Sequence, residues 1–246
     1  MGVVTGVLVS WEVSSRAGLL PEVLFSSPTT VLVTLWDAVL SGEMGRHLFA
    51  TLGRMIPGLL LGGIPGLFLG LVMGWSSRLR RAVDPLLMAV HPIPKIAMLP
   101  LLMIFLGIGE ASRIAVVAIA AFFPMLINTM AGVRQISPIY FEVAQNYGAS
   151  RYKLFTRVVF PGCIPMAMSG LRLAANVTLL VTIAVEIIVA EEGLGSLVWV
   201  AWETFRVEVL YATLIVISAL GVGVSTGLER MNRQLVPWGE SGAGRR

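Results

Sequence analysis

Charged residues are scarce in this chain of 246 residues: Asp, Glu, Lys and Arg make up 13% of it, whereas hydrophobic residues make up 56%. Soluble domains carry about 25% charged residues, so a soluble fold of this size would lack the charge to cover its surface. The mean hydropathy is +0.84. The composition therefore predicts a membrane protein. No segment resembles a separate soluble domain, which favours a single transmembrane domain over residues 1–246.

Cysteine and histidine are scarce too. Cys163 is the only cysteine, so no disulfide can form within the chain and no cluster of cysteines can hold a metal. The only histidines, His47 and His91, lie far apart in the sequence. The chain also has no Gly-x-x-x-x-Gly-Lys-Ser/Thr phosphate loop and no His-Glu-x-x-His zinc motif. We therefore expect neither a metal nor a cofactor in this chain, and no enzymatic activity of its own.

Long apolar runs are abundant instead. A membrane-spanning helix needs about 20 mostly apolar residues, and the chain offers six such runs, which predict an all-α, polytopic transmembrane helix bundle. The runs are Gly2–Leu20, His47–Trp75, Asp84–Leu106, Ile114–Val133, Pro161–Ala190 and Val209–Leu228. The first run, which contains Glu12 and Arg16, is the weakest. Pro28–Leu40 and Leu194–Phe205 read as short helices at the membrane surface.

The basic residues alternate between the connecting segments. One set of segments holds Arg78, Arg80, Arg81, Arg134, Arg151, Lys153, Arg157, Arg230, Arg233, Arg245 and Arg246, and the other set is mainly acidic. Basic residues favour the cytoplasmic side of a membrane. With six spans, this pattern places both termini in the cytoplasm. The net charge of +4 is explained by this orientation, so we expect no binding to nucleic acid.

Ionisable and helix-breaking residues at membrane depth are costly and need a reason. Two prolines, at 92 and 94, break the third run between His91 and Lys95, which indicates either a structural kink or a part of a translocation pathway. Glu186 lies deep in the fifth run. It can pair with Lys95 or cap a broken helix, or it can be a carboxylate that lines or gates a pore, and the sequence leaves these alternatives open. Arg54 and Arg172 are expected to reach the membrane surface from near the ends of their spans.

The longest cytoplasmic segment, residues 132–161, is predicted to fold as a helical hairpin. Ser137 and Pro138 suit the start of a helix, and Gly148 suits a left-handed C-terminal cap. A second helix is expected over Arg151–Phe160, ended by Pro161. The first helix would expose an apolar face, which indicates a protein partner. That face holds Ile139, Phe141, Val143, Ala144 and Tyr147.

This segment resembles the EAA loop of the permeases of ATP-binding-cassette (ABC) importers. Glu142, Ala144, Gly148 and Pro161 match the family motif, and Val143 replaces its middle alanine. Other segments resemble the sulfonate, taurine and nitrate branch, in which Lys95 departs from the usual apolar residue or proline. These segments include Pro92–Pro94, Phe105–Glu110, Phe123–Pro124, Ala131–Val133 and Gly193–Gly195. The resemblance implies a type I importer permease fold and a helix that couples the chain to an ATPase.

The resemblance also implies partners. The importer would lie in the lipid bilayer of a prokaryotic inner membrane. It would be completed by a second copy of this permease, two ABC ATPase subunits that bind ATP and Mg, and an extracytoplasmic solute-binding protein. The solute would be a small anion such as a sulfonate, taurine, nitrate or bicarbonate, and His91, Lys95 and Glu186 are the candidate pathway residues. An ion-coupled secondary transporter is the alternative, but such proteins usually contain an internal repeat, and the sequence has no matching halves.

Overall fold

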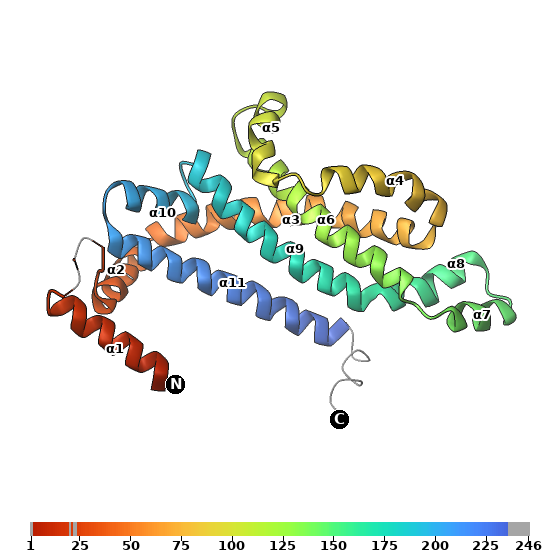
Figure 1. Cartoon of the computed structure of the whole chain (residues 1–246), viewed down its shortest axis with the longest axis horizontal. Coiled ribbons are helices and arrows are strands. Elements are labelled where there is room, and N and C mark those ends of the chain that lie inside the picture. Colours follow the sequence, from red (N-terminus) through yellow and green to blue (C-terminus); the bar gives the residue numbers. More distant parts are fainter. Residues whose placement is uncertain (1, 20, 22–23, 236–246) are drawn as a thin grey trace. The chain divides into compact units, whose positions relative to one another are not determined.

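The computed structural model describes residues 2–19, 21 and 24–235, and every regular element within them is helical (Figure 1). The C-terminal residues 236–246 lie outside the described residues. In chain order the elements are α1 (Gly2–Arg16), α2 (Pro28–Leu40), α3 (Glu43–Trp75), α4 (Ser77–Val90), the 3-10 helix η1 (Lys95–Met98), α5 (Leu99–Leu106), α6 (Glu110–Arg134), α7 (Pro138–Asn146), α8 (Arg151–Leu154), the π-helix η2 (Phe155–Val159), α9 (Phe160–Val189), α10 (Leu194–Glu203) and α11 (Val207–Leu235).

The chain divides into two compact units, each of which is discontinuous in sequence. Unit 1 consists of Met1–Gly53 and Thr182–Val222, and unit 2 consists of Arg54–Val181 and Gly223–Arg246. The single transmembrane domain expected over residues 1–246 stays a prediction.

Among the described residues, four helices are long and apolar enough to cross a membrane, and they agree with four of the predicted spans. They are α3, α6, the continuous helix Arg151–Val189 that contains α8, η2 and α9, and the stretch Val207–Gln234 of α11. Each has a mean hydropathy of 1.9 to 2.1 over its most apolar window. The two predicted short helices are observed as α2 and α10, and their place at the membrane surface stays a prediction.

The third predicted span is broken rather than continuous. The segments Ser77–Val90 and Lys95–Leu106 meet at an angle of 89°, as the two prolines of this stretch lead one to expect. Gly58 of α3 lies against Val117 of α6, and Gly74 lies against Val133, so both helices advance by 16 residues in the same direction. Because α3 and α6 run parallel, the chain between them has to return across the membrane. The bent pair therefore acts as one broken crossing.

The first predicted span is represented by α1, whose described part has 15 residues. At 1.5 Å per residue this part is about 22 Å long, whereas a hydrocarbon core is roughly 30 Å thick. Its Glu12 accepts hydrogen bonds from the hydroxyl (2.8 Å) and the backbone N–H (3.0 Å) of Thr29. The described helices after α1 supply up to five crossings. A crossing by the first run and a cytoplasmic location of both termini stay predictions.

A ridge of glycines explains how closely α3 and α6 pack. Gly58, Gly62, Gly66, Gly70 and Gly74 follow one another at four-residue intervals and all face α6. A Cβ atom at Gly66 or Gly70 would lie 2.6 Å from a backbone carbonyl oxygen of α6, and one at Gly62 would overlap the carbonyl of Ala118. Small residues allow such close backbone contact between membrane helices. The ridge is therefore a packing surface between the two helices.

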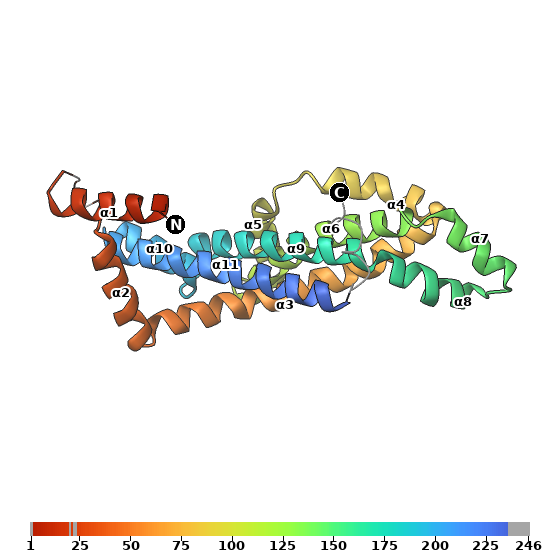
Figure 2. The ribbon, with the colours of Figure 1, turned by 90° about the horizontal axis from the view of Figure 1, so that it is seen from below.

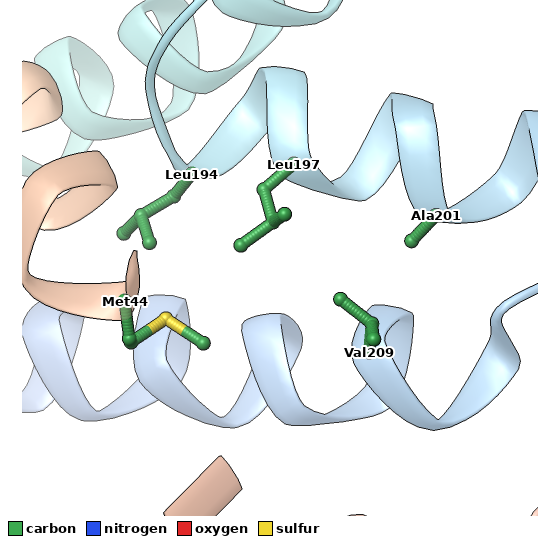
Figure 3. Close-up of a cluster of buried hydrophobic side chains, with 5 residues drawn as sticks. All are labelled: Met44, Leu194, Leu197, Ala201 and Val209. Carbon is green, nitrogen blue, oxygen red and sulfur yellow. The ribbon is translucent and has the colours of Figure 1, made fainter. Parts of the chain in front are cut away.

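The core of unit 1 lies where α10 packs against α3 and α11. Leu194, Leu197 and Ala201 of α10 face Val209 of α11 and Met44 of α3, and all five side chains are buried (Figure 3). The three residues of α10 recur at spacings of three and four, so they share one helical face. This core fixes α10 along its length, whereas its N-terminus is held by the polar contacts described below.

Candidate functional site

The candidate coupling loop forms a helical hairpin at one end of unit 2, where α7 and α8 lie next to each other (Figures 1 and 2). Helix α7 begins after Ser137, whose backbone is extended, and has Pro138 in its first turn. The Ser150 hydroxyl accepts the N–H of Lys153 (3.4 Å) at the start of α8. Serine and proline therefore occupy the helix starts at which they were predicted.

Gly148 ends α7 in the left-handed conformation, with φ of +67°. Its N–H donates to the carbonyl of Gln145 (2.8 Å), and the N–H of Ala149 donates to the carbonyl of Ala144 (2.9 Å). These two bonds form a Schellman motif, which satisfies carbonyls that the helix end leaves free. The predicted left-handed cap at Gly148 is confirmed, and it sets the direction in which the chain turns towards α8.

Pro161 does not end the second helix as predicted. The chain passes from α8 through η2 into α9 without a break, so that one helix runs from Arg151 to Val189. Proline cannot donate the usual backbone bond, and the wider π-helical turn ahead of it accommodates this loss within a continuous helix. The loop is therefore joined rigidly to a membrane-spanning helix on this side.

Helix α7 has two distinct faces. Ile139, Val143 and Tyr147 are exposed by 56%, 48% and 89% and form one stripe. Phe141 was predicted to belong to this stripe, but it turns inwards, and Ala144 is half-buried. Glu142 is exposed beside the apolar stripe. The exposed face is therefore narrower than predicted, but it remains an apolar surface with one carboxylate on a short helix.

The inner face of α7 contacts the ends of the long helices. The Phe141 ring lies 6.3 Å from the ring of Trp75, the last residue of α3, and the Phe155 ring of η2 lies 6.0 Å from the same indole. Nearby, Leu71, Val133, Val159 and Cys163 form a buried cluster against which Phe141 and Phe155 pack. A movement of α7 would therefore reach α3 through the contact of Phe141 with Trp75 and with the buried cluster.

The broken crossing holds two of the predicted pathway residues. The Lys95 ammonium group donates to the carbonyls of His91 (2.5 Å) and Ile93 (2.8 Å), which the break leaves without helical partners. It also lies 4.6 Å from the centroid of the Phe123 ring, and the His91 ring lies 5.1 Å from that ring. Lys95 thus stabilises the break. A role for His91 and Lys95 in a pathway stays a prediction.

Glu186 is completely buried in unit 1 and caps the N-terminus of α10. Its carboxylate accepts hydrogen bonds from the Thr51 hydroxyl and from the N–H of Gly195, both at 2.9 Å. The Thr51 hydroxyl oxygen in turn accepts the N–H of Leu194 (2.9 Å), and Nδ1 of His47 lies 3.1 Å from the N–H nitrogen of Gly193. The same Nδ1 lies 2.9 Å from the Gly193 carbonyl oxygen, so the tautomer of His47 decides which backbone group of Gly193 it binds. The N–H groups of Leu194 and Gly195 therefore both have side-chain acceptors, and His47 contacts the residue before them.

These contacts support the capping interpretation of Glu186, because a carboxylate stabilises the positive end of a helix dipole. They also explain the Gly193–Gly195 segment. A Cβ atom at Gly193 or Gly195 would collide with Glu186. The roles of His47 and Thr51 were not foreseen. The two lie one turn apart on α3, and only this spacing could have indicated a shared function. A pathway role for Glu186 stays a prediction.

Arg54 does not reach the membrane surface as predicted. It is 5% exposed, and its guanidinium group binds both carboxylate oxygens of Glu110 at 2.7 and 2.8 Å. Arg113 binds the same carboxylate at 2.7 Å. A bidentate arginine–carboxylate pair is strong and directional, and it compensates for burial of the arginine. The pairing connects α3 to the first turn of α6 within unit 2.

One enzyme-like sequence pattern has no catalytic geometry. Residues 223–227 match Gly-x-Ser-x-Gly, which marks a nucleophile only on a sharp strand-to-helix turn. Here the segment lies inside the continuous helix α11, and the Ser225 hydroxyl lies 3.4 Å from the amide oxygen of Asn176. The pattern therefore does not indicate a hydrolase.

The sequence model of the family described as "Binding-protein-dependent transport system inner membrane component" matches residues 66–238. The taurine transport system permease protein TauC of Escherichia coli (strain K12) is 31% identical, over 97% of this chain and 88% of its own. The putative aliphatic sulfonates transport permease protein SsuC of the same organism is 33% identical, over 95% and 89%.

Two solved structures share the fold. One shows inward-facing conformations of the MetNI methionine ABC transporter, with a TM-score of 0.68 and 18% identity over 76% of this chain and 93% of the matched chain. The other is an amino acid ABC transporter with histidines, with a TM-score of 0.62 and 18% identity over 82% and 94%. The fold is that of a type I importer permease. The chain therefore belongs to the family of binding-protein-dependent transport system inner membrane components, as an ABC-importer permease of the sulfonate and taurine branch.

Proposed function

We propose that this chain forms the path by which a small anion enters the cell, and that the anion is a sulfonate, taurine, nitrate or bicarbonate. The names of the relatives support the first two of these solutes, because they are permeases for taurine and for aliphatic sulfonates. Lys95 adds a positive charge at the break of the third crossing. His91 and Lys95 are the residues that we expect at the pathway, and Glu186 is the less favoured third one.

The assembly that we propose contains two copies of this chain, because each supplies one coupling loop. Two ABC ATPase subunits would bind ATP and Mg and hydrolyse the ATP, and no cofactor is needed in this chain. An extracytoplasmic solute-binding protein would deliver the anion on the other side of the inner membrane. In this arrangement the basic segments, among them the coupling loop, face the cytoplasm, and both termini lie there as well if a sixth crossing precedes α2.

The coupling loop carries this proposal, and the observation that matters most is the exposed face of α7. Ile139, Val143 and Tyr147 would enter a groove on the ATPase, with Glu142 beside them. Closure of the ATPase dimer around ATP would move α7. The contact between Phe141 and Trp75 would pass the movement to α3, and the continuous helix from Arg151 would pass it to α9. The crossings would then tilt and open the path.

A secondary transporter is the weaker alternative. It would leave the structured, exposed loop without a role, and no finding on this chain favours it. Robust uptake by the purified chain alone in liposomes, without an ATPase, would support it.

The test compares two substitutions that each add one negative charge at an exposed position. Val143→Glu lies on the exposed stripe of α7, and Gln135→Glu lies at the end of α6, away from that stripe. We expect Val143→Glu to weaken recovery of the ATPase with the purified permease at least tenfold, because a carboxylate in an apolar groove costs several kcal/mol unless it is paired. Taurine uptake should fall with it. Gln135→Glu should leave both measurements unchanged.

Equal recovery of the ATPase with both variants would contradict docking through this face of α7. Normal thermal unfolding of the two purified variants is the control for folding, since both positions are exposed.

A further inference from the structure

An open cavity of about 620 Å³ lies in unit 2 beneath the inner face of α7, and arginines line it. Arg78 comes from the first turn of α4, Arg134 is the last residue of α6, and Arg151 is the first residue of α8. No Asp or Glu lines the cavity. Within the described part of the chain, none of these three arginines takes part in an ion pair. Three helices, α4, α6 and α8, thus each place at this cavity an arginine without an acidic partner among the described residues.

Neutral donors complete the lining. Ser76, Ser77 and Gln145 contribute side chains to the cavity. Ser77 and Arg78 are the first residues of α4, so their backbone N–H groups have no acceptor within the helix. Such N–H groups, together with arginine guanidinium groups, suit a phosphate group with several oxygen acceptors.

The cavity lies where two membrane crossings end. Trp75 ends α3 and Arg134 ends α6, and both residues line the cavity. Tryptophan and arginine at the end of a span are typical of the headgroup layer on the cytoplasmic side. Basic pockets between membrane helices on that side bind anionic lipid headgroups. Orientation of the chain accounts for the sign of these charges, but not for their convergence on one cavity.

The two faces of α7 separate this cavity from the docking surface. Phe141 and Gln145 line the cavity, whereas Ile139 and Val143 lie on the exposed stripe. Residues 141 and 143 point about 160° apart on a helix of 3.6 residues per turn, and so to nearly opposite sides. An ATPase seated on the exposed stripe would therefore leave the cavity open, which favours a lipid over an acidic segment of that partner.

We propose that this cavity binds the phosphate group of an anionic phospholipid, which would sit between the start of α4 and the coupling helix α7. The bound headgroup would join Arg78, Arg134 and Arg151 across α4, α6 and α8. It would thereby fix the inner face of α7 relative to the crossings. The anionic lipid content of the inner leaflet would then influence how firmly the coupling helix is held.

The experiment measures lipid binding to the full chain. The permease, alone and with its ATPase subunits, is placed in phosphatidylcholine nanodiscs that contain a minor fraction of fluorescent phosphatidylglycerol, and binding is titrated. The cavity variant carries R78Q, R134Q and R151Q. The matched control carries R81Q, R157Q and R230Q, which remove the same charge from basic residues that do not line the cavity. A third variant replaces the three cavity arginines by lysine.

We expect the cavity variant to bind phosphatidylglycerol roughly 100-fold more weakly, because each arginine near an anionic surface contributes about fivefold. The control should lose far less, and the lysine variant should keep part of the affinity because it keeps the charge. Equal losses in the cavity variant and the control would overturn the proposal in favour of general surface charge. Loss of binding when the ATPase is added would overturn it in favour of a protein partner.

A last comparison separates a lipid from a soluble ion. Inorganic phosphate is titrated against the permease in pure phosphatidylcholine nanodiscs, and the Trp75 fluorescence that reports on the cavity is compared with a Trp75→Phe background. A weak or absent response to phosphate supports the lipid. A response as strong as that to phosphatidylglycerol would overturn the assignment to a lipid and leave a soluble anion as the ligand.

Discussion

Unit 2 requires glycine in two regions for opposite reasons. At Gly62, in the contact between α3 and α6, a Cβ atom would overlap the carbonyl of Ala118. At Gly148, in the coupling loop, a Cβ atom would have nothing within 4 Å, but φ is +67°. The first glycine is required by close packing and the second by backbone conformation.

This difference separates the part of the molecule that holds it together from the part that we propose meets the ATPase. Packing between α3 and α6 leaves no free space, so changes there act on folding. The loop around Gly148 is open on its outer side, so changes there leave the fold intact and act on what docks. The buried cluster around Glu186 combines features of both regions. It is closed to solvent like the helix contact, but its contacts are polar.

The largest effect is expected for Gly62→Ala. The added methyl group has to displace the backbone of α6 around Ala118, and overpacking of this kind costs more than the usual 1–3 kcal/mol when backbone must move. We expect little monodisperse protein after purification in mild detergent. Gly63→Ala is the matched control on the same helix, since the nearest atom to its Cβ is Leu59 Cδ1 at 4.0 Å. If both variants unfold at the same temperature, the close contact between α3 and α6 is refuted.

Glu186→Leu should have the next largest effect. It removes the acceptor of the Gly195 N–H and the closer acceptor of the Thr51 hydroxyl, which keeps the His47 carbonyl at 3.2 Å. A buried donor without an acceptor costs about 1–3 kcal/mol. Thermal unfolding in detergent should show the loss, whereas Glu203→Leu, at an exposed position of α10, should not. Glu186→Gln keeps an acceptor oxygen and should be milder. A stable Gln variant that no longer transports would instead favour the pathway role of this carboxylate.

The sequence predicted those features that depend on local chemistry. Proline and serine at helix starts, glycine at the end of α7, and the prolines that break the third crossing each act within a few residues, so the elements were placed correctly. The apolar runs also act locally, and four of them match helices long and apolar enough to cross a membrane.

Most of the features that the sequence missed depend on distant partners. The burial of Arg54 requires Glu110, which lies 56 residues away. The inward turn of Phe141 requires Trp75, and the capping by His47 and Thr51 requires Gly193 and Leu194. Neither periodicity nor residue type indicates which helices meet, so these contacts need the folded structure. The continuous passage through Pro161 was missed because a π-helical turn has no simple sequence signal.

The smallest effect on stability, and the sharpest test of the comparison, is expected at Gly148. A left-handed conformation costs an L-residue roughly 1–2 kcal/mol, and more for a β-branched one, while Asn tolerates it better. Gly148→Val should therefore misdirect the loop, so that uptake is lost although the purified permease unfolds at nearly the same temperature. Gly148→Asn should retain a substantial part of the uptake. Because the Cβ of either residue has open space around it, a difference between them can only come from backbone conformation. Equal loss of uptake in both variants would show that the partner needs a residue without a side chain at this position. Glycine would then be required for close packing both at Gly62 and at Gly148.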